Sequence, residues 1–377
     1  MPCRSVALVH AALLALVLCA CGASAATGGS RHAARASHAH AGTEAGFERR
    51  ATSLYARVLA EMRGRGHYAA GVWHPASLCW RCGTELGAAA AILSREPGQA
   101  PYGQLAIDTF NATLTAHQQP NGSFGPPAAG DPISTEAEIV SLGEAYLELR
   151  PRLPAAVGQR WRRAIVAATE WVIPRLSFYV NGNVNLQQTL AMYIAWRVTG
   201  DPRYYREYDA SWAFTLHPGS HWVGLGLHYS RVPTLASGVD GAGYLAEMGP
   251  GAPGFDPHYT ILQADYAAAL YVLSHQARAL RLVNLLFNQL QTRTNDRTLT
   301  IQTGRGSRHP QPNVSGHLAT CALPVLAFAD RSHLQALALT QLSLARTDFL
   351  NYVRTNNDQD QVIGNYAVVL MALHPPA

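Results

Sequence analysis

Apolar residues at spacings of three and four dominate this sequence, and this period is typical of one face of an α-helix. It recurs in about a dozen segments, which cover residues 47–63, 83–96, 102–117, 134–149, 159–176, 185–200, 202–216, 257–275, 277–291, 316–330, 332–353 and 359–374. Strand patterns are limited to short pieces such as "TLTIQT" and "HWVGLGLHY". The sequence therefore predicts an all-α fold.

Several helix boundaries are also readable. Ser134 and Asp256 are side chains that cap helix N-termini, and Pro257 suits the first helical position. Gly200, in "VTGDPRYY", is the residue type that most often ends a helix. These signals predict helices that start near residues 134 and 257 and one that ends at residue 200.

The N-terminus has the pattern of a secretory signal. Arg4 precedes an apolar run over residues 6–19, which is too short to span a membrane. The run ends in "LCAC", which resembles the lipobox of bacterial lipoproteins, so residues 1–20 would be removed and Cys21 lipidated. Cleavage after Ala25 is the alternative. We expect an exported protein of the cell envelope, anchored by lipid or freely secreted or periplasmic.

Residues 21–45 have no apolar period and predict a flexible linker, which leaves residues 46–377 as one domain. An apolar fraction of 48% is enough for a large core. The net charge of +5 is modest and spread out, which does not indicate a nucleic-acid partner. All 29 basic residues are arginine, which excludes lysine Schiff-base chemistry. We expect a monomer that touches membranes only through a lipid anchor.

Three cysteines remain after export, namely Cys79, Cys82 and Cys321. In an oxidising compartment a disulfide is favoured over free thiols or a zinc site, because no fourth ligand lies at metal spacing. The pairing stays open, and one thiol must be unpaired. We expect neither a metal nor a cofactor.

About a dozen paired helices can form a bundle, an open solenoid or a closed double ring. "QQPNGSFGP" followed by "STEAEIVSLGEAYLEL", and also "VTGDPRYYREY", resemble the inter-helix turns of α/α toroids. Polysaccharide lyases, several glycoside hydrolases and terpene cyclases share this architecture. No repeat of fixed period supports a solenoid. The resemblance implies an α/α toroid and a carbohydrate-active enzyme.

Two segments, 217–257 and 291–315, are too long to be simple connections. We expect both to lie over the same end of the ring and to fold over a substrate cleft. Their candidate substrate-binding residues are Trp222, Tyr244, Arg305, Arg308 and His309.

The stretch "GFDPHYTILQADY" allows two interpretations. It is an ordinary helix start in which Asp256 caps the helix and His258 lies in the first turn, or it is catalytic. "FDPHYTILQADYAAALY" resembles a segment of toroid lyases that presents a histidine and a downstream tyrosine. On that resemblance His258 and either Tyr266 or Tyr259 are catalytic.

A second polar cluster, "NGNVNLQQTLAMY", precedes another helix. Its asparagines suit helix capping, but in toroid lyases an asparagine at a comparable place binds a uronate carboxylate. On that resemblance Asn185 is catalytic, and Gln188, three residues on and on the same face, binds substrate.

β-Elimination at a uronate explains this combination. Hydrogen bonds or cations that neutralise the carboxylate acidify the C5 proton, which a histidine or tyrosine then removes. The preferred prediction is thus a lyase that acts on uronate-containing polysaccharide.

A glycoside hydrolase of the same fold is the alternative, and it needs two carboxyl groups across a cleft. Asp240, Glu247, Asp256 and Asp265 are the candidates for that pair. A non-catalytic glycan-binding or surface-assembly lipoprotein is the remaining possibility.

Overall fold

The computed structural model describes residues 29–64, 68–74, 84–126, 129–176, 179–219, 223–230, 241–249, 252–295, 300–304, 307, 313–315, 322–329, 332–339, 342 and 370–371. The chain divides into two compact units, residues 1–42 and 43–377.

The described part of the first unit is the beginning of α1 (Gly29–Met62). The sequence predicts a flexible linker up to residue 45, whereas residues 29–45 are helical. The difference has a physical reason, because this stretch is rich in alanine, which has the highest helix propensity.

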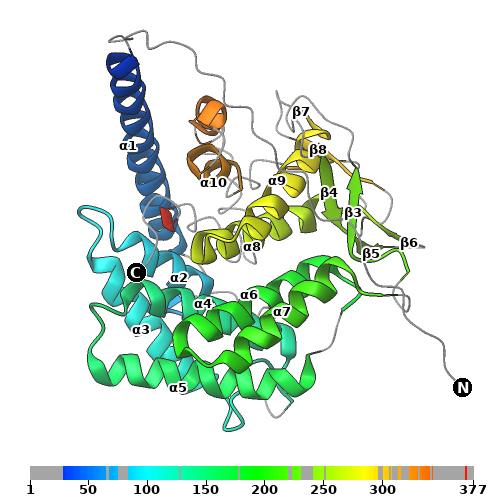
Figure 1. Cartoon of the computed structure of the whole chain (residues 1–377). Helices are drawn as coiled ribbons and strands as arrows, with labels where there is room; N and C mark the ends of the chain where they lie inside the picture. The colour runs from blue at the N-terminus through cyan, green and yellow to red at the C-terminus, as the bar shows by residue number, and fades with distance from the viewer. Residues whose placement is uncertain are drawn as a thin grey trace, which may run out of the picture. The chain divides into compact units, whose positions relative to one another are not determined.

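The second unit consists mainly of helices in two layers (Figure 1). The inner helices are α2 (Thr84–Leu93), α4 (Pro132–Leu149), α6 (Gly182–Thr199) and α8 (Pro257–Ser274), and each packs against the next. Each is followed along the chain by an outer helix: α3 (Pro101–Ala116), α5 (Ala155–Val172), α7 (Pro202–Leu216) or α9 (Ala277–Gln291).

Burial distinguishes the two layers. Every residue of α2 is buried, and α4 is buried along nearly its whole length. The outer helices α5 and α9 instead alternate buried apolar residues with exposed arginines. This amphipathic pattern is the usual one for a helix with one solvent face.

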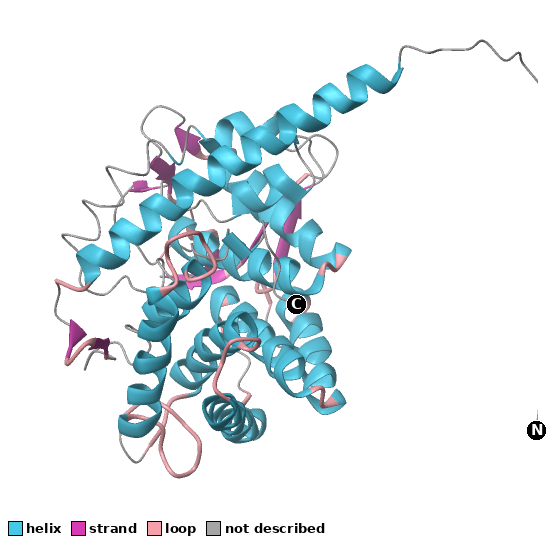
Figure 2. Ribbon diagram, turned by 90° about the vertical axis from the view of Figure 1, so that its left-hand side faces the viewer, coloured by secondary structure: helices cyan, strands magenta, loops and turns pink. Residues whose placement is uncertain are grey.

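The circuit of helices closes through α10 (Ala322–Ala329), which packs on both α8 and α9. The ring of Phe328 on α10 lies 5.1 Å from the ring of Phe47 on the second unit's part of α1, measured between centroids. Tyr102 on α3 donates a hydrogen bond to the carbonyl of Ala56 on α1. Helices make up most of the described chain, and the strands among them are short (Figure 2). The predicted all-α toroid is confirmed.

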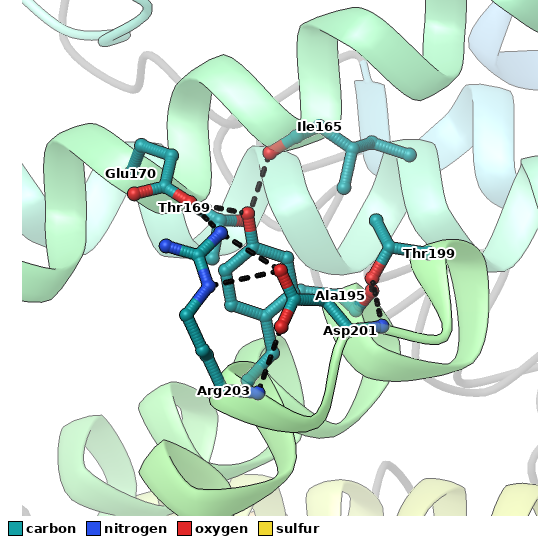
Figure 3. Close-up of polar contacts among 8 residues, drawn as sticks. Ile165, Thr169, Glu170, Ala195, Thr199, Asp201 and Arg203 are labelled. Carbon is teal, nitrogen blue, oxygen red and sulfur yellow. Dashed lines mark hydrogen bonds and ion pairs between the residues drawn. The ribbon is translucent and has the colours of Figure 1, made fainter.

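The turn "VTGDPRYY" connects α6 to α7 as predicted (Figure 3). Gly200 ends α6 with a φ of 75°, a conformation that glycine adopts without strain. Asp201 caps α7 by accepting a 2.9 Å hydrogen bond from the backbone N–H of Arg203. The Arg203 guanidinium also pairs with Asp201 and with Glu170 of α5.

Helix starts follow the sequence signals with one correction. Asp256 caps α8 and Pro257 is its first residue, as predicted. However, α4 begins at Pro132, and its cap is Asp131, which accepts a 2.7 Å hydrogen bond from the backbone N–H of Ser134. Ser134 lies inside the helix because Pro132 pre-organises the first turn two residues earlier.

Short antiparallel strands lie outside the helices. They are β1 (Tyr68–Ala69) with β2 (Val72–Trp73), β3 (Leu227–Ser230) with β4 (Ala242–Leu245), β5 (Glu247–Gly249) with β6 (Ala252–Gly254), and β7 (Thr294–Asn295) with β8 (Thr300–Gln302) and β9 (Asn313–Ser315). The strands expected in "HWVGLGLHY" and "TLTIQT" are β3 and β8. The 3₁₀ helices η1 (Ile173–Arg175) and η3 (Ser332–Leu334) complete the described elements.

None of the helices in the described part of the chain is both long and apolar enough to cross a membrane.

Candidate functional site

The inner helices enclose a small cavity with polar walls. Its volume is about 10 Å³, close to the room that one water molecule needs. It is lined by Glu85 and Ala88 of α2, Ala137, Val140, Ser141 and Glu144 of α4, Gln187 of α6 and Tyr266 of α8. We call it the axial cavity. Four inner helices thus contribute to one site.

One wall of the axial cavity is held by hydrogen bonds. The hydroxyl of Tyr266 donates to Oε1 of Gln187 over 2.8 Å. The amide nitrogen Nε2 of Gln187 donates to the carbonyl of Ile133 over 2.9 Å. These two bonds hold the tyrosine hydroxyl at the cavity wall. Tyr266 is buried, with only 3% of its surface exposed.

Two carboxyl groups, those of Glu85 and Glu144, also line the axial cavity. Burial raises the pKa of Glu144 to about 8. This carboxyl is therefore largely protonated at pH 7 and can donate a proton. Glu85 instead lies in the first turn of α2, where the helix dipole and the free backbone N–H groups stabilise negative charge. Two carboxyls on one cavity, of which burial holds Glu144 neutral, can serve as an acid and a base.

Further buried carboxyls lie on the inner helices but do not line the cavity. Burial raises the pKa of Glu138 to about 8, although Thr84 donates a 2.9 Å hydrogen bond to it. Burial raises the pKa values of Glu136 and Asp265 well above their usual range. Among the described residues, neither Glu136 nor Asp265 has a hydrogen-bond partner for its carboxyl oxygens. The inner helices therefore carry several buried carboxyls whose neutral form is favoured.

The site residues predicted from the sequence do not include Glu85, Glu144 or Gln187. A usable signal was present in "STEAEIVSLGEAYLEL", where glutamates occur on all sides of an otherwise apolar helix. A helix without a separate polar face is buried all round, and its charged residues then face the interior.

The sequence predicts His258 and either Tyr266 or Tyr259 as the residues that transfer the proton. Of these three, Tyr266 lines the axial cavity. His258 and Tyr259 lie half-buried in the first turn of α8, with their rings edge to face at 5.6 Å. Tyr259 lies seven residues before Tyr266, so both occupy the same side of α8, two turns apart. The cavity lining does not include His258 or Tyr259.

The predicted carboxylate-binding residues make contacts elsewhere. Asn185 accepts a hydrogen bond from the backbone N–H of Tyr179 and donates another to the carbonyl of Tyr179, both 2.8 Å long. Gln188 donates to Ser211 on α7 over 3.0 Å and so faces the outer layer. Its neighbour Gln187 faces the axial cavity instead.

Of the carboxylates predicted as candidates for a hydrolase pair, Glu247 and Asp256 support helix starts. Glu247 is fully buried and accepts hydrogen bonds from the backbone N–H of Asn183, near the start of α6, and from Gln263. Asp256 accepts a 3.1 Å bond from the backbone N–H of Tyr259 and another, also 3.1 Å, from Ser307. Asp265 lies on α8, one residue before Tyr266.

The two long segments meet at the start of α8. Tyr244 stacks on His228 at 5.0 Å and meets the edge of Phe255 at 5.5 Å. From the second segment, Ser307 binds Asp256, and Gly304 packs against Phe255. The described parts of both segments therefore lie at the same end of the ring, as the sequence predicts.

Other predicted residues lie outside the described part of the chain and stay predictions. They are the substrate-binding candidates Trp222, Arg305, Arg308 and His309, the carboxylate Asp240, and the cysteines Cys21, Cys79, Cys82 and Cys321. Within the described ranges, no three histidine, cysteine, aspartate or glutamate side chains are grouped as metal ligands.

Known proteins that are similar to this chain were found by comparing structures and not by comparing sequences. No family model matches the sequence, and no curated protein matches it. Two solved structures of unsaturated glucuronyl hydrolase from Streptococcus agalactiae are similar, one of them a mutant complexed with dGlcA-GalNAc6S. Each has a TM-score of 0.51 and 11% sequence identity, and the match covers 86% of this chain and 90% of the other.

The chain has the α/α-toroid fold of these enzymes. At 11% identity the likeness establishes the arrangement of helices and not the chemistry.

Proposed function

We propose that the protein is a carbohydrate-active enzyme that hydrolyses a glycosidic bond in an acidic oligo- or polysaccharide. The observation that carries this proposal is the placement of two carboxyl groups, Glu85 and Glu144, on one axial cavity of about 10 Å³. The similar glucuronyl hydrolases, one of which is complexed with dGlcA-GalNAc6S, support both the reaction class and the acidic sugar.

In this proposal Glu144 is the general acid. Its pKa of about 8 keeps the carboxyl protonated at neutral pH, so that it can protonate the leaving oxygen of the glycosidic bond. Glu85, at the positive end of the α2 dipole, is the general base that takes a proton from the attacking water.

Inverting glycosidases hold a water molecule between the base and the sugar. The axial cavity has room for that water but not for a sugar ring, so in this proposal the ring reaches Glu85 and Glu144 from outside the cavity. The sugar would lie at the end of the ring where the segments 217–257 and 291–315 meet. There Tyr244 and the predicted Trp222, Arg305, Arg308 and His309 would contact it.

A lyase is the second candidate, because Tyr266 lines the same cavity and its hydroxyl is held by Gln187. A tyrosine can remove the C5 proton of a uronate and return a proton to the leaving oxygen. Gln187 then takes the role of carboxylate binder that the sequence predicts for Asn185 and Gln188. The contacts of Asn185 with Tyr179 leave its amide occupied, which makes hydrolysis the stronger proposal.

The two reactions differ in their products. Purified protein is incubated with a panel of acidic oligo- and polysaccharides, and new reducing ends are measured together with ultraviolet absorbance. Hydrolysis gives reducing ends without the absorbance of an unsaturated uronate, whereas elimination gives both. Binding without either product would instead indicate a glycan-binding protein and would contradict the enzymatic proposal.

Glu138→Gln is the matched control for Glu144→Gln. Both glutamates lie on α4, both are buried, and burial raises the pKa of each to about 8, but only Glu144 lines the cavity. The proposal predicts that Glu144→Gln and Glu85→Gln lower turnover by about a hundredfold or more, while Glu138→Gln keeps it. Equal activity in all three variants would contradict it.

We also propose that the protein is exported and anchored through Cys21, as the N-terminal signal predicts. Fatty-acid labelling that Cys21→Ser abolishes supports the anchor. Unlabelled secreted protein contradicts it.

A further inference from the structure

A second cavity lies on the outer layer of helices, away from the axial cavity. Its volume is about 370 Å³, within the range of ligand-binding pockets. It is lined by Trp212 and Leu216 of α7, His217 at the end of that helix, Leu227 and Tyr229 of β3, and Arg278, Arg281, Leu282 and Leu285 of α9. We call it the outer pocket. It shares no lining residue with the axial cavity.

The floor and walls of the outer pocket are suited to the flat apolar face of a sugar. Leu282 and Leu285 are buried, and Leu216 and Leu227 pack against the core. Tyr229 is 40% exposed, which is unusual for a large ring among the described residues. Aromatic rings that combine an apolar face with a polar tip are common contact residues at binding surfaces.

Two arginines give the pocket a positive rim. Arg278 is fixed in place: it donates to Asp209 over 2.6 Å and to Gln276 over 2.7 Å, and its guanidinium lies 5.0 Å from the ring of Trp212. The contact with the carboxylate of Asp209 already offsets much of the positive charge of Arg278.

Arg281 differs from Arg278. It is exposed, its guanidinium lies 6.0 Å from the ring of Tyr229, and no ion pair joins it to a carboxylate within the described residues. An exposed guanidinium beside an aromatic ring can bind a carboxylate or sulfate through two parallel hydrogen bonds.

We propose that the outer pocket binds an acidic sugar residue of an oligosaccharide, with Arg281 as the anion-binding group and Tyr229 as the stacking surface. The choice of an acidic saccharide rests on the proposed function, but the pocket is separate from the proposed catalytic carboxyls. Such a pocket would hold a second stretch of a long polymer while the axial site acts on another.

The test is direct binding of a tetrasaccharide of galacturonic acid to the full-length protein, measured by calorimetry. The fully methyl-esterified tetrasaccharide is the ligand control, because it has the same sugars without the negative charges. We expect binding of the acidic form, weakened by salt, and about tenfold weaker binding by Arg281→Gln.

Arg206→Gln is the matched protein control. Arg206 is an exposed arginine on α7 that does not line the pocket. Unchanged binding by Arg206→Gln and weaker binding by Arg281→Gln would support the site. Equal affinity of Arg281→Gln and the wild type, or equal binding of the esterified ligand, would overturn it.

Glu144→Gln separates this proposal from the proposed hydrolase function. If the outer pocket is a distinct site, Glu144→Gln retains the binding that depends on Arg281, whether or not the enzyme cleaves sugars. Loss of that binding in Glu144→Gln would place the ligand in the axial cavity and overturn the assignment to the outer pocket.

Discussion

The buried acid Glu144 makes the stability of the protein depend on pH in a predictable way. Its pKa is about 8 in the folded chain, against 4.5 for an exposed glutamate. Below pH 4.5 the carboxyl is protonated in both states and contributes no pH dependence. Between 4.5 and 8 the unfolded chain loses the proton while the folded chain keeps it, so stability falls as pH rises. Above 8 both states are ionised, and the loss is complete.

The magnitude follows from the pKa difference. The slope for one carboxyl is about 1.4 kcal/mol per pH unit in the middle of this window and smaller near both pKa values, which gives a loss of about 3 to 4 kcal/mol between pH 5 and pH 8. Glutamine has nearly the same shape and does not titrate. Glu144→Gln should therefore remove this part of the pH dependence. Relative to the wild type, the variant should gain about 3 to 4 kcal/mol in free energy of unfolding over that interval.

Equilibrium unfolding in urea at pH 5, 6, 7 and 8 measures this difference. The quantity of interest is the variant's free energy of unfolding minus that of the wild type at each pH, since other buried carboxyls contribute equally to both. Glu138→Gln should show a similar trend, because burial gives Glu138 a pKa of about 8 as well. A difference that is the same at pH 5 and pH 8 would refute the assignment of Glu144 as a neutral buried acid.

Three further predictions follow from contacts of the inner helices. Gly143→Ala should destabilise the protein by about 1 to 3 kcal/mol, since a Cβ there would lie 2.1 Å from a methyl carbon of Ile194. Thermal or urea unfolding measures this change, and unchanged stability would contradict the close packing of α4 on α6. Gly200→Ala should cost about 1 kcal/mol because of the positive φ at the end of α6, and a more stable variant would count against that conformation. Tyr266→Phe should slow an eliminating enzyme about a hundredfold or more but leave a hydrolase largely active, which product assays would distinguish.

The sequence predicted the outer architecture better than the interior. Outer helices such as α5 and α9 have one solvent face, so their apolar period indicates which face packs on the core. Gly200, Asp256 and Pro257 mark boundaries through local preferences, which need no knowledge of the rest of the fold.

The interior required the fold, because α2 and α4 are buried almost all round and have no period that indicates which face lines the axis. Gln187 and Gln188 illustrate the difficulty. They are neighbours in the sequence, yet one faces the axial cavity and the other faces α7, since successive residues of a helix point about 100° apart. Asn185 and Asp256 have the chemistry of binding residues but hold a loop and a helix start, which only their partners reveal.

Glu144 acts as the general acid at the axial cavity only if turnover of Glu144→Gln falls far below that of Glu138→Gln on an acidic oligosaccharide that the wild type cleaves. Reducing ends and ultraviolet absorbance are followed in the same reaction. The proposal predicts reducing ends without absorbance, nearly abolished by Glu144→Gln and retained by Glu138→Gln. Retained turnover in Glu144→Gln, or products that absorb as unsaturated uronates, would contradict it.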